Sequence, residues 1–250
     1  MQELSMLSRS HSHYNPNPQN PAFDTVLVPQ GMEYKTVRQG MGKNKSKVNI
    51  IPIPVGIKPL TNFLEQWQQC PDFLNKLPQG LILMGLGGSL SKKYSVGDVI
   101  LYKKCGLMDD SQESKGQCNH FLTERLFQLL GNSTFMGTGI TSDHVICSAQ
   151  EKLLLGKKYQ ADVVDMEGYA LWNWSQKLGI PVAMIRVISD NCEQDLPNLT
   201  KAFREDGSLQ PLILARQMLK NPSNSIHLIR SSLTSLRVLK EVANKISQYE

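Results

Sequence analysis

The 250-residue sequence contains few cysteines, no long apolar run and no strong excess of charge. Its five cysteines are widely spaced and form no CxxC pair, which argues against a disulfide framework and against a zinc site. No apolar run approaches the roughly 18 residues that a membrane-spanning helix needs, and no charged-then-apolar signal pattern opens the chain. We therefore expect a cytoplasmic protein without a membrane span.

A nucleic-acid surface is not indicated either. The formal net charge of +5 is mild, and lysine and arginine form no run interleaved with aromatic residues. The remaining composition, 40% hydrophobic and 20% charged, is that of an ordinary globular protein. We expect the polar, Pro/Asn-rich residues 1–22 to form a flexible leader and residues 23–250 to form a single domain.

Short apolar runs alternate with helical patterns along the chain. Many runs are nearly continuous in Val, Ile and Leu, which is typical of strands covered on both faces. The expected strands are 25–28, 48–55, 81–84, 96–102, 162–166 and 182–189. The expected helices cover about 32–40, 60–69, 121–130, 150–158, 167–178, 210–220 and 225–245. This order predicts an α/β fold, a three-layer α/β/α sandwich around a mixed, largely parallel central sheet.

One carboxylate stands where an apolar side chain is expected. Glu167 opens the helix expected at 167–178, and Leu171, Trp174 and Leu178 follow it on the same helical face. An isolated buried carboxylate costs on the order of several kcal/mol. Glu167 must therefore be paired, protonated or kept for a ligand.

Other chemically active side chains follow expected strands, at the edge where α/β sheets bind ligands. They are Glu33, a glycine-rich turn with Gly85, Gly87 and Gly88, and Ser189-Asp190, whose strand we expect to run parallel beside 162–166. Taken alone, Asp190 has the ordinary role of capping a turn and Glu33 that of a solvated helix start. Their convergence with Glu167 on one edge instead predicts a site for a hydroxyl-bearing ligand, which glycine backbone approaches closely.

These residues carry a resemblance to a known family. VVDMEG (163–168), followed by IRVISD (185–190), resembles the purine nucleoside phosphorylase and uridine phosphorylase superfamily, which includes methylthioadenosine/S-adenosylhomocysteine nucleosidase. GLGGSLSKKYSVGDVILY resembles the second signature of that family, and TSDHVI (141–146) resembles the segment that faces the base. In order and spacing, the resemblance covers the chain from about Thr25 to Asp190.

The resemblance implies a role for each matching residue. Asp190 matches the acid that protonates the purine at N7, and Ser189 supports it. Met166 and Glu167 match the pair that packs under the ribose and binds its hydroxyl groups. Glu33 matches the carboxylate that activates water in the nucleosidase branch. Hydrogen bonds and proton transfer of this kind help most where charge develops as the glycosidic bond breaks.

Other positions match in part. Val145 and Ile146 fall where the family reads the base through main-chain groups, and Arg186 matches an arginine with a structural or electrostatic role. Phosphorolytic members usually place arginines soon after the first strand and at the glycine-rich turn. Here the turn contains none, and near the first strand only Lys35 and Arg38 are available. This departure favours hydrolysis over phosphorolysis.

The C-terminal segment DGSLQPLILARQMLKNP also resembles the hopanoid-associated branch, proposed to release adenine from adenosylhopane. We therefore predict an enzyme that cleaves the N-glycosidic bond of a purine nucleoside, adenine-bearing and modified at the 5′ position. The alternatives are a phosphate-dependent nucleoside phosphorylase and a non-catalytic nucleoside-binding protein. No cofactor is expected, apart from phosphate as co-substrate in phosphorolysis, and no metal. The expected partners are a small-molecule nucleoside and further copies of the chain in a homo-oligomer.

Overall fold

The structure is a computed structural model of the chain, and it describes residues 22–42, 48–109, 115–131, 133–197, 210, 219 and 222–248. The expected leader at 1–22 and the expected helix at 210–220 lie outside these residues, apart from single positions. The division of the chain into leader and domain therefore stays a prediction.

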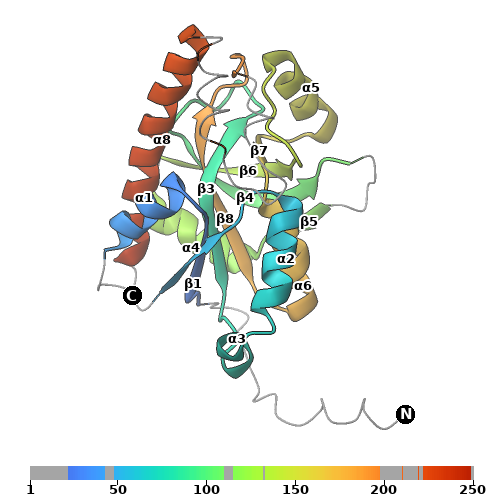
Figure 1. Ribbon diagram of the computed structural model, residues 1–250, viewed down its shortest axis with the longest axis vertical. Coiled ribbons are helices and arrows are strands. Elements are labelled where there is room, and N and C mark those ends of the chain that lie inside the picture. Colours follow the sequence, from blue (N-terminus) through green and yellow to red (C-terminus); the bar gives the residue numbers. More distant parts are fainter. Residues whose placement is uncertain are drawn as a thin grey trace.

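A mixed sheet forms the centre of the described part of the chain (Figure 1). Its strands are β1 (Thr25–Pro29), β2 (Asn49–Ile53), β3 (Leu81–Ser89), β4 (Val99–Leu107), β5 (Lys115–Gln117), β6 (Thr134–Thr141), β7 (Val163–Asp165) and β8 (Val182–Asp190). Parallel pairs are β1 with β2 and β3, β3 with β8, and β6 with β4 and β7. β7 pairs antiparallel with β3, and β4 pairs antiparallel with β5 and β8. The predicted mixed α/β fold is confirmed.

Strand β8 joins two parts of the sheet. It pairs with β3 over most of its length and with β4 at Val99–Leu101. Because β3 also reaches β4 through β7 and β6, these strands and β8 make a closed circuit. Gly88 of β3 pairs with both Val164 of β7 and Asp190 of β8. The ends of these strands therefore meet at one point.

Helices cover both faces of the sheet (Figure 1). They are α1 (Met32–Met41), α2 (Ile57–Trp67), α3 (Pro71–Asn75), α4 (His120–Leu130), α5 (Ala149–Tyr159), α6 (Gly168–Leu178) and α8 (Pro222–Ser247). On one face Val26 and Ile82 pack with residues of α1, α4 and α8. On the other face Leu27 and Leu83 pack with residues of α2, α3 and α6. Adjacent residues of a strand thus belong to hydrophobic cores on opposite faces of the sheet, because successive side chains of a strand point to opposite faces.

Several local expectations differ from the structure. The strand at 162–166 does not run parallel beside 182–189: β3 lies between β7 and β8, antiparallel to β7 and parallel to β8. The expected glycine-rich turn is part of β3, which continues to Ser89. Strand β6 was not predicted, because its sequence TFMGTGIT interrupts the apolar pattern with glycine and threonine. Strand β5 and the short helix α3 were not predicted either.

Candidate active site

A cavity of about 920 Å³ opens where β1, β3, β7 and β8 end, beneath the first half of α8. Most of the residues that the sequence singled out line it: Glu33, Gly87, Gly88, Val145, Ile146, Met166, Glu167, Ser189 and Asp190. Gly85 and Arg186, which the sequence also singled out, are not part of the lining.

Glu167 is the last residue before α6 and is almost wholly buried. Its Oε1 accepts a hydrogen bond from the Gly56 backbone N–H at 3.1 Å, and its Oε2 accepts one from Arg186 Nη2 at 3.1 Å. Burial raises the pKa of Glu167 above its ordinary value, and the Arg186 guanidinium opposes this shift. Of the three possibilities that the sequence left open, the structure therefore shows pairing, and Glu167 also lines the cavity.

Arg186 lies in the middle of β8 with no exposed surface. Its Nε donates to Asp165 Oδ2 at 3.0 Å, in addition to the bond to Glu167. The other oxygen of Asp165 accepts from the Thr141 hydroxyl at 2.7 Å and from the Gly168 N–H at 3.1 Å. Asp165 thus connects the ends of β6 and β7 to the middle of β8, and it holds the guanidinium group that holds Glu167.

Glu33 lies in the first turn of α1, partly buried against β3. Its Oε1 accepts a hydrogen bond of 2.5 Å from the Leu86 N–H. Burial and the neighbouring Glu167 raise the pKa of Glu33 from 4.5 to about 7, against the opposing charge of Arg186. A carboxyl group with this pKa exchanges its proton readily near neutral pH.

The glycines of β3 allow these charged groups to approach the strand. A Cβ atom at Gly85 would clash with Arg186 Nη1 and would lie 3.3 Å from Glu33 Oε1. A Cβ atom at Gly88 would lie 3.0 Å from Asp190 Oδ2. These glycines are therefore needed for close approach of side chains, and not for a turn.

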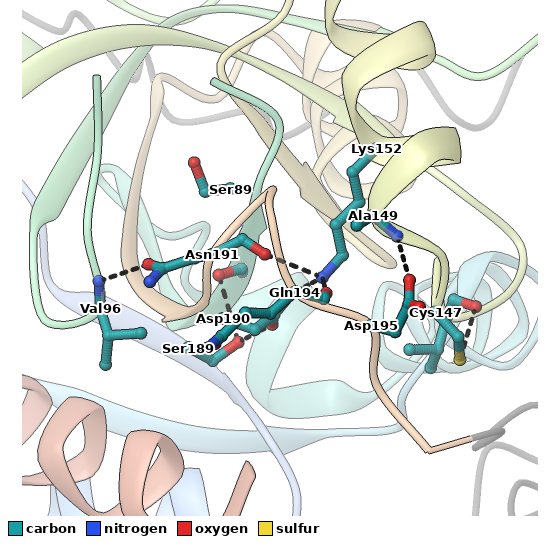
Figure 2. A network of polar contacts seen from close by, with 12 residues as sticks. Ser89, Val96, Cys147, Ala149, Lys152, Ser189, Asp190, Asn191, Gln194 and Asp195 are labelled. Atoms are coloured by element: carbon teal, nitrogen blue, oxygen red, sulfur yellow. Dashed lines mark hydrogen bonds and ion pairs between the residues drawn. The ribbon is translucent and has the colours of Figure 1, made fainter. Parts of the chain in front are cut away.

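Asp190 ends β8 and reaches the cavity with little exposed surface. Its Oδ1 lies 2.6 Å from the Ser189 hydroxyl, which also lies 3.2 Å from the Gly87 carbonyl oxygen. Its Oδ2 accepts from the Lys152 ammonium at 2.6 Å (Figure 2). Sequence reasoning missed Lys152, because a lysine in the first half of a helix gives no signal that its side chain is buried.

The far side of the cavity is apolar and comes from α8. Leu228, Ile229, Leu233 and Leu236 line it together with Ser232. The same helix continues into the core through Leu239 and residues beyond it. From the sequence we expected this helix to pack on the sheet. The sequence did not predict that the first half of the helix would line the cavity. His144 and Lys35 also line the cavity.

A family model described as "Phosphorylase superfamily" matches residues 72–220, more than half of the chain. The chain belongs to the phosphorylase superfamily. Membership identifies it as an enzyme that acts on nucleosides, and supports cleavage of the N-glycosidic bond as its general type of reaction. No curated protein matches the chain in sequence.

Solved structures with the phosphorylase superfamily fold are similar over nearly the whole chain. A 5′-methylthioadenosine/S-adenosylhomocysteine nucleosidase from Campylobacter jejuni has a TM-score of 0.62 at 14% identity, covering 90% of this chain and all of that one. A futalosine hydrolase from Helicobacter pylori has a TM-score of 0.62 at 18% identity, covering 87% and 95%. A putative methylthioadenosine/adenosylhomocysteine nucleosidase from Francisella philomiragia has a TM-score of 0.64 at 16% identity, covering 89% and 97%. At these identities the likeness establishes the fold alone.

Within the described ranges, no helix is both long and apolar enough to cross a membrane. In the same part of the chain, no three or more His, Cys, Asp or Glu side chains are grouped as a metal ion would require.

Proposed function

We propose that this member of the phosphorylase superfamily hydrolyses the N-glycosidic bond of an adenine-bearing nucleoside that carries an apolar substituent at its 5′ position. One observation carries the proposal: Glu33, Glu167 and Asp190 line the same cavity, each held by hydrogen bonds to backbone or to a charged partner. A group of ionisable side chains in one cavity is typical of an active site.

The base leaves from the side of Asp190. Rupture of the bond between C1′ and N9 moves its electron pair onto the purine, which becomes a poor leaving group unless a proton reaches N7. In our proposal the carboxyl group of Asp190 donates that proton, while its second oxygen accepts from the 6-amino group. A 6-oxo base would place an acceptor oxygen against this second oxygen, so adenine is favoured over hypoxanthine.

The ribose lies over Glu167 and Met166. As the bond breaks, positive charge develops on the ribosyl ring, and a carboxylate that accepts hydrogen bonds from the ring hydroxyls stabilises this charge. Arg186 and the Gly56 N–H hold the Glu167 carboxyl group in one orientation. The stabilisation therefore needs no reorganisation during the reaction.

Water is the attacking group in our proposal, with Glu33 as its base. The pKa of about 7 suits Glu33 to take a proton from water near neutral pH. Arg186 Nη1 is buried near Gly85 without a hydrogen-bond partner among the described residues, and its guanidinium keeps positive charge close to Glu33 and Glu167. Phosphate fits less well, because it would meet the charges of Glu33 and Glu167 while Lys35 is the only lysine or arginine in the described lining.

The apolar wall of α8 supports a substituent at the 5′ position. A volume of about 920 Å³ is at the upper end of ordinary ligand sites, and base and ribose occupy only part of it. Leu228, Ile229 and Leu233 supply apolar surface that a free 5′-hydroxyl group would not use.

Release of free base tests the proposal. Wild-type protein is incubated with adenosine, methylthioadenosine, inosine and an adenosine with a long 5′-alkylthio chain, each with and without phosphate. We expect adenine and free sugar without phosphate, with the highest kcat/KM on the alkylthio substrate. Strict dependence on phosphate, with a sugar phosphate as product, would establish the phosphorylase alternative. Tight binding without any release of base would establish a nucleoside-binding protein.

Two expectations from the sequence stay predictions. They are the cytoplasmic location and the homo-oligomer, and light scattering of the purified protein would test the second.

A further inference from the structure

Lys152 is the only lysine among the described residues that is buried, and its side chain has no exposed surface. It lies in the first half of α5 and extends away from the helix toward the loop that follows β8 (Figure 2). Its neighbours Lys157 and Lys158, at the end of the same helix, are exposed. Removing an ammonium group from water costs solvation free energy, so this burial calls for a specific set of partners.

Three oxygen atoms surround the ammonium group. Lys152 Nζ lies 2.6 Å from Asp190 Oδ2, 3.2 Å from the Asn191 carbonyl oxygen and 3.3 Å from the Gln194 carbonyl oxygen. An ammonium group has three N–H donors, and each donor here has an acceptor. Asp190 is the only side-chain partner among the three and the only one that can ionise. Asp190 lines the cavity, whereas Lys152 does not.

The contacts determine how the Asp190 carboxyl group is held. Oδ2 is occupied by Lys152 and Oδ1 by the Ser189 hydroxyl at 2.6 Å. Gly88 leaves room for this arrangement, since a Cβ atom there would lie 3.0 Å from Oδ2. With a partner on each oxygen, the carboxyl group is held in one orientation where Asp190 lines the cavity.

We infer that Lys152 is a positioning residue for base departure: its ammonium group orients Asp190 and balances the negative charge that Asp190 acquires when it gives its proton to the base. The inference rests on the proposed function. In the step concerned, the Asp190 O–H bond breaks, the N7–H bond forms and the electron pair of the C1′–N9 bond goes to the purine. Asp190 is left as a carboxylate beside the ammonium group, and Lys152 keeps its own proton throughout.

A purely structural role is the alternative. Lys152 also ties down the loop at Asn191 and Gln194, and Asp195 Oδ1 attaches the same loop to α5 by accepting from the Ala149 N–H at 2.7 Å. If Lys152 only anchors this loop, replacing it would lower activity on all substrates alike. A residue that acts through Asp190 affects only substrates whose base needs a proton in order to leave.

The test compares two substrates on two variants. In Lys152→Met the side chain keeps its length and loses its charge, and Lys157→Met removes the same charge from the exposed end of the helix. We expect Lys152→Met to lower kcat on an adenine nucleoside about 10- to 100-fold, part of the ~10²- to 10⁴-fold effect of a general acid, with little change in KM. On a nitrophenyl riboside, whose leaving group departs without a proton, the loss should stay below about threefold. Lys157→Met should match wild type on both.

A double-mutant cycle with Asp190→Asn tests whether Lys152 acts through Asp190. If it does, Lys152→Met should cause almost no further loss in protein that already carries Asp190→Asn. Equal losses on the two substrates, unchanged kcat on the adenine nucleoside, or an additive loss in the double variant would each overturn the inference. If Lys152→Met does not fold, Lys152→Gln, which keeps N–H donors without charge, takes its place. Failure of both variants to fold would establish the structural role instead.

This test is separate from the proposed function. If wild-type protein releases base and Lys152→Met keeps its rate, only the inference about Lys152 fails. If wild-type protein releases no base, the proposed function fails, and calorimetric binding of free adenine still tests Lys152. In that case we expect Lys152→Met to weaken adenine binding about as much as Asp190→Asn does, and unchanged binding would overturn the inference.

Discussion

The two ends of the cavity are built in different ways. At the polar end, Glu167 follows β7 and Asp190 ends β8. Glu167 is paired with Arg186 and Asp190 with Lys152, and both of these basic side chains are buried. At the apolar end a single helix, α8, supplies the wall, and Ile229 and Leu233 keep 46% and 61% of their surface exposed. The polar end therefore has fixed geometry, as bond cleavage requires. The apolar end offers contact area without directional bonds, which suits the apolar substituent that we propose for the 5′ position.

The largest effect is expected at the polar end, from Asp190→Asn. The amide cannot donate a proton to N7 as an acid, so kcat/KM on an adenine nucleoside should fall about 10²- to 10⁴-fold. A nitrophenyl riboside should lose much less, because its leaving group needs no proton. Lys152 would keep only neutral acceptors, so stability should also fall, by about 1–3 kcal/mol.

Steady-state kinetics on both substrates and urea denaturation measure these effects. Asp72→Asn, on the exposed surface of α3, is the matched control for loss of a carboxylate. Equal losses on the two substrates would mean that Asp190 holds the ribose or the loop and does not act as the acid.

The next effect concerns the proposed attack by water. Glu33→Gln should lower turnover about 10²-fold, because water loses its base, while a non-cleavable nucleoside analogue should bind as in wild type. Rapid-quench kinetics and isothermal calorimetry separate the two quantities. Parallel losses in turnover and analogue binding would assign Glu33 to substrate binding.

The same group predicts a pH dependence. The pKa of Glu33 is raised to about 7, so its carboxyl group is protonated below that pH and cannot accept a proton from water. The rate of cleavage should therefore fall about tenfold per pH unit below about 7 and level off above it. In Glu33→Gln, the residual activity should not show this fall in rate at low pH. If the variant shows the same fall as wild type, the fall is caused by another titrating group.

A smaller effect is expected from Glu167→Gln. The amide keeps an oxygen that can accept from the Gly56 N–H, but it loses the charge that strengthens the ribose contacts. We expect kcat/KM to fall about 10- to 30-fold on any riboside, including the nitrophenyl riboside, because ribose recognition does not depend on the base. An effect confined to adenine nucleosides would contradict this assignment.

The smallest effect is expected at the apolar end. Leu233→Ala removes apolar surface from the cavity wall, so KM for an adenosine with a long 5′-alkylthio chain should rise about 5- to 10-fold. KM for adenosine itself should not change. Ile226→Ala provides the control, because Ile226 is exposed on the same helix and does not line the cavity. Equal responses of the two substrates would place the 5′ position elsewhere.

Much of the polar end could be predicted from local sequence. Glu167 stands out because a carboxylate starts an apolar helical stripe, and Glu33 and Asp190 stand out because they follow apolar strands. The reasoning that placed them together was partly wrong, because β7 and β8 are neither paired nor parallel. The ends of β7 and β8 still lie close together, because Gly88, near the end of β3, pairs with both strands.

The sequence by itself determined the class of fold, the positions of most helices and strands, and the carboxylates of the site. Those features depend on periodicity and on residues close together in the chain, where a few residues carry the whole signal. Only the tertiary structure decided the closed circuit of strands, the turn of α8 toward the cavity, and the pairing of Asp190 with Lys152. These features join residues that are distant along the chain, such as Lys152 and Asp190, which are 38 positions apart. Such pairings depend on how the strands and helices pack against one another, and no local pattern of residue types encodes that packing.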